Sequence, residues 1–304
     1  MKNILLEGLY ILAGLVSLIT AYMAYKDKEL KTRTGTAVFW FLLAFTFIVG
    51  KYVPPEVIGV AILIMGGLTA FKQVNFGSLK NAPDAFREEK SQKFGNKLFI
   101  PALTIAVVAF AVGQFTDLGG LVGMGFGAIL ATIIALVMTK VETKYIGYDG
   151  SRLLGQVGSA SILPQLLAAL GALFSAAGVG EVIAQGISGV IPQGNILAGV
   201  IAYCVGMALF TMIMGNAFAA FAVITAGIGI PFVYTQGATP WIAGALALTA
   251  GYCGTLMTPM AANFNIVPAA ILETKDKNRV IYSQVPLAIV LLITHIVLMY
   301  FWAF

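Results

Sequence analysis

The sequence predicts an all-α fold, a polytopic bundle of about nine or ten transmembrane segments. Of the 304 residues, 59% are hydrophobic and only 10% are charged, whereas a soluble domain carries about 25% charged residues. Because lipid offers no hydrogen bonds to a backbone, apolar runs of this length must be helical. The expected segments are 4–25, 35–50, 55–71, 98–115, 119–139, 153–178, 196–214, 217–233, 241–272 and 285–303.

The positions of the basic residues predict how these segments alternate across the membrane. All but two of the 18 Lys and Arg residues fall in the loops 26–34, 72–97, 140–152 and 273–284. The positive-inside rule makes these loops cytoplasmic and both chain ends external. The basic charge therefore reports topology, and no nucleic-acid partner is expected. The expected location is the cytoplasmic (inner) membrane of a bacterium, with the lipid bilayer as solvent.

The most informative region is an uncharged stretch that contains helix-breaking residues. Residues 182–272 include no Asp, Glu, Lys, Arg or His. Within it, Gly215 and Asn216 separate two apolar runs, which predicts either two crossings or a re-entrant hairpin over 196–233. Segment 241–272 would be about 48 Å long as one helix, against a bilayer core of about 30 Å. We therefore expect a discontinuous helix, unwound from Gly254 to Pro259 and helical again from Ala261.

These observations divide the chain into two functional halves. Residues 1–152 are expected to form scaffold-like helices with cytoplasmic loops, and 153–304 to carry a substrate site. Irregular backbone in a membrane survives only where it lines a protected cavity, and broken helices commonly bind substrates and ions there. The residues expected to bind substrate are Asn216, Thr255, Thr258, Asn263, Asn265 and Gln165.

Three further residues are expected to take part in ion coupling. Gly254 and Pro259 open the helix, and the freed carbonyl groups there could coordinate Na⁺. His295 is the sole histidine of the chain and falls within the last segment, which makes it a candidate for H⁺ coupling. Each polar residue also has a structural alternative, as a helix cap or an interhelical hydrogen bond. The sequence has no metal-binding, nucleotide-binding or hydrolase motif, so neither a metal nor a cofactor is expected, and the protein is not expected to be an enzyme.

Three sequence runs resemble a known family of membrane proteins. They are ILPQLLAALG at 162–171, MGNAFAAF at 214–221 and GYCGTLMTPMAANFNIVP at 251–268. They look like the larger membrane subunit of the bacterial two-component 5-oxoproline (pyroglutamate) transporters, a family formerly known only as a domain of unknown function. The hairpin followed by a broken helix is also similar to the ion transporter superfamily, in which two inverted halves each contribute such a pair.

The resemblance implies that this chain supplies one half of a carrier. It has one hairpin and one broken helix, so a smaller membrane subunit is expected to supply the complementary half. The expected function is ion-coupled secondary transport of a small carboxylate, 5-oxoproline first, by alternating access. The alternatives are a non-transporting membrane scaffold, a channel, and a carrier of another organic acid such as a gluconate-like or dicarboxylate substrate.

Overall fold

The chain forms two helical units in the computed structural model, which describes residues 1–188 and 194–304. The first unit is Met1–Gly158 and the second is Ser159–Phe304, so the division lies close to the predicted boundary after 152. The described residues contain no β-strand. Seven of the described helices are long and apolar enough to cross a membrane. The expected fold class, an all-α multi-pass membrane protein, is confirmed.

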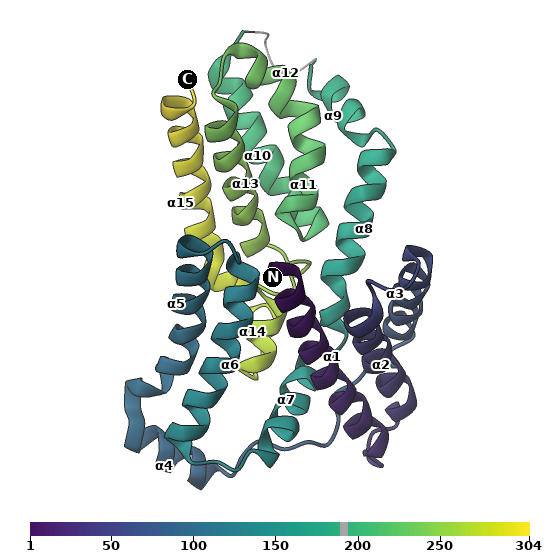
Figure 1. Cartoon of the computed structure of the whole chain (residues 1–304). Helices are drawn as coiled ribbons and strands as arrows, with labels where there is room; N and C mark the ends of the chain where they lie inside the picture. The colour runs from purple at the N-terminus through teal and green to yellow at the C-terminus, as the bar shows by residue number, and fades with distance from the viewer. Residues whose placement is uncertain (189–193) are drawn as a thin grey trace. The chain divides into compact units, whose positions relative to one another are not determined.

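The first unit is built on two pairs of antiparallel helices and a helix that packs on α1. Within it α1 packs against α2 and α7, and α5 packs against α6 (Figure 1). Glycine permits the close approach of α6 to α5, since a Cβ on Gly123 would lie 3.0 Å from the Cα of Ala109. The elements are α1 (Lys2–Lys26), α2 (Arg33–Val49), α3 (Pro55–Ala70), α4 (Asp84–Phe94), η1 (Gly95–Phe99), α5 (Ile100–Phe115), α6 (Gly120–Thr139) and α7 (Lys144–Val157).

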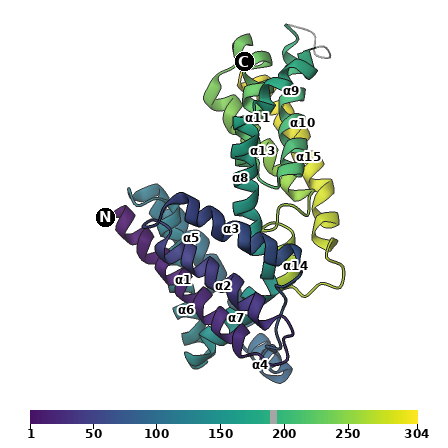
Figure 2. The ribbon, with the colours of Figure 1, turned by 90° about the vertical axis from the view of Figure 1, so that its right-hand side faces the viewer.

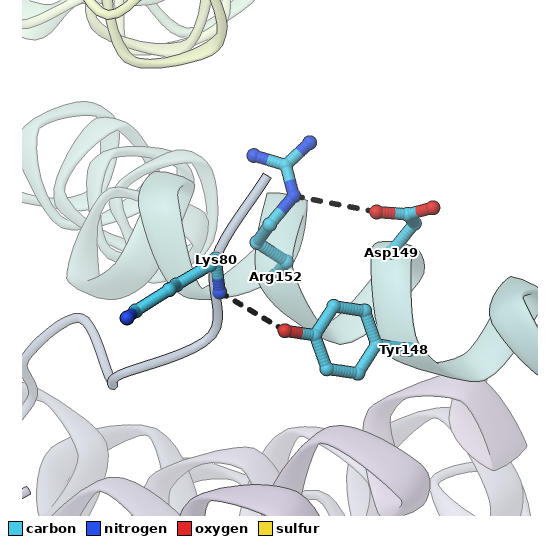
Figure 3. Close-up of polar contacts among 4 residues, drawn as sticks. All are labelled: Lys80, Tyr148, Asp149 and Arg152. Atoms are coloured by element: carbon cyan, nitrogen blue, oxygen red, sulfur yellow. Dashed lines mark hydrogen bonds and ion pairs between the residues drawn. The ribbon is translucent and has the colours of Figure 1, made fainter. Parts of the chain in front are cut away.

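A hydrogen-bonded loop joins the ends of several of these helices. After α3, the chain passes Asp27, whose carboxylate accepts hydrogen bonds from the backbone N–H and the hydroxyl of Ser78, at 2.6 and 3.0 Å. Farther on, the N–H of Lys80 donates to the Tyr148 hydroxyl on α7, at 3.0 Å (Figure 3). Partial burial raises the pKa of Asp27, but the hydrogen bonds outweigh burial and hold that pKa below its usual value.

An ion pair on the same face of α7 lies beside this loop. The Arg152 guanidinium Nε lies 3.4 Å from a carboxylate oxygen of Asp149, one helical turn away (Figure 3). The Arg152 side chain is 12% exposed, so this pair is better shielded from water than an ordinary surface pair. Loop 72–83 is therefore an ordered part of the first unit, attached at α1 and at α7.

The second unit is a bundle in which α10 and α13 form the centre. Helix α10 packs against α11, α13 and α15, and α13 also packs against α11 and α15 (Figure 2). Small residues bring α13 onto α10, since a Cβ on Gly254 would collide with the backbone of Ala208. The elements are η2 (Gly158–Ile162), α8 (Leu163–Ala176), α9 (Val179–Ser188), α10 (Ile196–Met214), α11 (Ala217–Ile224), η3 (Thr225–Gly229), α12 (Ile230–Phe232), η4 (Tyr234–Gln236), α13 (Pro240–Leu256), α14 (Ile266–Ile271) and α15 (Arg279–Trp302).

Segment 196–233, predicted as either two crossings or a re-entrant hairpin, forms two helical arms joined at Gly215 and Asn216. The second arm continues from α11 through the π-helical turn η3. Beside η3, the buried Tyr203 hydroxyl hydrogen-bonds the hydroxyls of Thr225 and Tyr234, at 2.7 and 3.1 Å. Both arms are long enough to span a membrane, so length is compatible with two crossings as well as with a re-entrant hairpin.

The predicted break in segment 241–272 is also present, but its limits differ from those expected. Helix α13 persists through Leu256, and the predicted return to helix at Ala261 is wrong because α14 begins only at Ile266. Between them the chain makes tight turns, in which the N–H of Phe264 donates to the carbonyl of Ala261 at 3.1 Å. Side chains satisfy part of this backbone, which removes the need for an early return to helix.

Candidate binding hollow

The tip of the α10–α11 hairpin lies directly against the irregular segment. Gly215 ends α10 in the left-handed conformation, with φ +66°, which glycine adopts without strain. A Cβ at this position would lie 2.5 Å from the carbonyl oxygen of Met260. Asn216 then starts α11 as its N-cap, with its side-chain oxygen accepting from the N–H of Phe218 at 2.9 Å.

Two polar side chains hold the irregular segment in place. Asn265 is 1% exposed, and its amide nitrogen donates to the carbonyl oxygens of Thr255 and Thr258, at 2.8 and 2.6 Å. The Thr258 hydroxyl donates to the carbonyl oxygen of Met212 on α10, at 2.8 Å, and accepts from the N–H of Met260. Asn265 therefore caps the end of α13, and Thr258 ties the break to the neighbouring helix.

Between the hairpin tip and the break, the second unit has a partly open hollow of about 280 Å³. Its polar wall includes Asn216 and Asn263. Within the described part of the chain, the Asn216 amide nitrogen makes no hydrogen bond, and neither does the Asn263 side chain, which is exposed. The lining residues are Pro164, Leu167, Gly215, Asn216, Ala217, Phe218, Tyr252, Thr255, Met260, Ala262, Asn263 and Phe264.

Three aromatic rings form a large part of the apolar wall. Tyr252 lies between Phe218 and Phe264, with ring centroids 6.2 and 6.1 Å away. The first pair is nearly perpendicular, at 85°, and the second is tilted at 52°, both within the usual range for aromatic contacts. None of the three was predicted as a site residue. For Phe218 and Phe264 the available signal was their position next to a predicted amide, two residues after Asn216 and one after Asn263.

The electrostatic character of the hollow comes from helix ends and amides. Its described lining residues include no Asp, Glu, Lys or Arg. The first residues of α11, Ala217 and Phe218, line it, and a helix N-terminus carries a partial positive charge. Amide N–H groups and a helix N-terminus together favour an anion over a cation.

The predicted substrate residues separate into two groups in the structure. Asn216, Thr255 and Asn263 line the hollow, although the Thr255 hydroxyl already donates to the carbonyl of Tyr252 at 2.6 Å. Thr258, Asn265 and Gln165 are not among the lining residues. Thr258 and Asn265 hold the break as described above. The Gln165 amide, oriented to satisfy its hydrogen bonds, donates to the carbonyls of Ser161 and Ile162 at 3.1 and 3.2 Å.

The predicted ion-coupling residues lie at other positions. Gly254 faces Ala208 at the α13–α10 contact, and Pro259 is exposed within the break. His295 lies on α15, where its ring Nδ1 is 2.7 Å from the carbonyl oxygen of Leu291. The structure does not bring His295 into the wall of the hollow, so a role in coupling would have to be exerted from outside it.

The sequence model of one protein family, described as "Protein of unknown function (DUF979)", matches residues 7–304. The chain belongs to this family. No curated protein and no solved structure matches the chain. The DUF979 match covers both units. It includes the hairpin and the break of the second unit, and therefore the residues that line the hollow.

Proposed function

We propose that this chain is a subunit of an ion-coupled secondary transporter for a small carboxylate, with 5-oxoproline as the first substrate to test. The observation that carries the proposal is the hollow between the hairpin tip and the interrupted helix. A site of this kind, in an otherwise apolar bundle, resembles the binding sites that discontinuous helices form in transporters. The family resemblance described above supports the same substrate class.

The chemistry of the hollow fits a small cyclic compound whose only charged group is one carboxylate. The carboxylate would face the amide of Asn216 and the first turn of α11, where N–H donors and the helix dipole favour negative charge. Asn263 would hydrogen-bond the ring amide, and Tyr252 with its two phenylalanine neighbours would contact the ring faces. A volume of about 280 Å³ lies at the lower limit of small-molecule sites, which favours small substrates.

The rest of the carrier is part of the same proposal. A smaller membrane subunit would contribute the complementary hairpin and broken helix, and Na⁺ or H⁺ would drive uptake. Alternating access would then expose the hollow to each side of the membrane in turn. The proposal extends to other small organic acids if 5-oxoproline is not carried.

The test is uptake of labelled 5-oxoproline by cells that express this chain together with a candidate for the proposed smaller membrane subunit. Asn263→Leu removes an exposed amide that has no structural bond, and Asn216→Ser keeps a capping oxygen while removing the amide donor. Each is expected to reduce uptake at low substrate concentration about three- to tenfold, the loss of one hydrogen bond. Asn278→Leu is the matched control, because Asn278 is exposed and makes no capping bond at the start of α15.

The outcomes separate the site from the function. Saturable uptake that is unchanged by Asn263→Leu and Asn216→Ser would show that the substrate binds elsewhere. A second outcome is that the chain gives no saturable uptake of any small carboxylate and shows no shift of its thermal unfolding with these acids. That result would indicate a non-transporting scaffold. Uptake that rises linearly with concentration would indicate a channel.

A further inference from the structure

Helix α4 has a segregated arrangement of charge that the transport proposal does not use. At 100° per residue, its three basic and two aromatic side chains fall within about 120° of its circumference, and its three acidic side chains lie on the rest. The basic and aromatic residues are Arg87, Lys90, Lys93, Phe86 and Phe94, and the acidic residues are Asp84, Glu88 and Glu89.

The side chains on the basic face already contact one another. The Lys90 ammonium lies 5.1 Å from the centre of the Phe86 ring, and the Lys93 ammonium lies 5.6 Å from that of Phe94. The rings therefore lie beneath the ammonium groups, as in side chains that extend from an apolar base toward polar headgroups. Helix α4 has no buried residue, so core packing does not account for this face.

The chain geometry places α4 next to a membrane-spanning helix. Gly95 ends α4 with φ +48°, and the short helix η1 then leads directly into α5. Figure 1 shows α4 turning away from the axis of α5. Residues Leu98, Phe99 and Ile100, at the junction, are exposed apolar side chains, as expected where a helix enters lipid. A helix at this level, attached through a bend, can lie parallel to the bilayer surface.

We propose that α4 is an interfacial helix, whose basic and aromatic face binds the anionic headgroups of the leaflet that α5 enters. Three cations on one face complement a negatively charged lipid surface. Two of them, Arg87 and Lys90, also pair with Asp84 and Glu89, whose side chains are 97% and 62% exposed, so lipid phosphates can compete for these cations. The two phenylalanine rings would lie at the boundary between the headgroups and the acyl chains. Loop 72–83, fastened to α1 and α7, limits how far α4 can leave this surface.

The test is hydrogen–deuterium exchange of residues 84–94 in the full chain, reconstituted in nanodiscs. One set of discs contains phosphatidylcholine alone, and the other an equal mixture of phosphatidylcholine and phosphatidylglycerol. We expect exchange at least about fivefold slower in the anionic discs. This difference should disappear in roughly 1 M salt, where the Debye length falls to about 3 Å.

Two variants with the same change in net charge provide the control. Lys90→Gln with Lys93→Gln removes two positive charges from the basic face, and should abolish the difference between the two kinds of disc. Ser91→Glu with Gln92→Glu adds two negative charges outside that face, and should leave most of the difference. Neither variant is expected to shift thermal unfolding of the chain, because among the described residues α4 has no substantial contact with another long helix. Equal exchange in both lipids, or equal loss in both variants, would overturn the proposal.

Discussion

Replacing Asn265 by Ala should destabilise the second unit, while replacing Asn263 by Ala should not. The buried amide of Asn265 donates to the carbonyl oxygens of Thr255 and Thr258, and Ala leaves both without a partner. A buried unsatisfied group costs about 1–3 kcal/mol, whereas hydrogen bonds measured inside membranes average about 0.6 kcal/mol. The Asn265 side-chain oxygen is itself buried and makes no bond within the described part of the chain, so its removal recovers part of the cost. The expected net loss is about 1–4 kcal/mol.

The assay is reversible unfolding of the purified chain in mixed micelles with increasing SDS, followed by far-ultraviolet circular dichroism. Asn263→Ala should change the unfolding free energy by no more than about 0.5 kcal/mol, because the side chain is exposed and makes no bond. Thr258→Val should fall between the two, since it loses the hydroxyl's bonds to the carbonyl of Met212 and the N–H of Met260 but leaves the two carbonyls bonded to Asn265. Binding of 5-oxoproline should show the opposite contrast, with Asn263→Ala weakening it about three- to tenfold. An Asn265→Ala chain as stable as the original would refute the reasoning.

Two further predictions concern other parts of the fold. The pKa of Asp27 is lowered in the folded chain. Its carboxylate therefore stabilises loop 72–83 above the usual aspartate pKa of about 3.9, and this stabilisation is lost as the pH falls through the lower pKa of the folded state. Protease cleavage of the loop should rise in that acid range, and Asp27→Asn should remove this pH dependence. Gly254→Ala should destabilise the chain by about 1–3 kcal/mol or more through overpacking against Ala208, whereas Gly67→Ala, which meets open space, should stabilise it by about 0.5–1 kcal/mol in the same SDS titration.

The long membrane helices could be located from the sequence, because each of them corresponds to one apolar run of sufficient length. Segment 119–139 and helix Gly120–Thr139 differ by one residue at the start, and segment 196–214 agrees with its helix at both ends. The sequence did not separate α7 from α8, because the 3₁₀ turn between them contains no charged residue and only one glycine. It also missed α9, a short helix that is too polar on one face to register as an apolar run.

The break in segment 241–272 shows why its limits could not be predicted from proline alone. Pro259 cannot donate a hydrogen bond, and this correctly indicated an interruption. Where the helix resumes depends on which side chains satisfy the freed backbone groups. Asn265, six residues later in the chain, fills this role for two carbonyls, and its contacts depend on how the segment folds back on the end of α13. No periodicity in the sequence encodes that fold.

The same argument explains why only some of the predicted site residues line the hollow. In an apolar bundle, an interrupted helix must first satisfy its own backbone groups, because neither lipid nor neighbouring apolar side chains can do so. Thr258 and Asn265 donate their side-chain hydrogen bonds to backbone carbonyls. Their donors are therefore not available to a ligand. Asn216 lines the hollow and needs only its side-chain oxygen to cap α11, which leaves its amide nitrogen without a hydrogen bond in the described part of the chain. The donors that remain unbonded after the backbone is satisfied, on Asn216 and Asn263, are therefore the ones that a carboxylate substrate would meet.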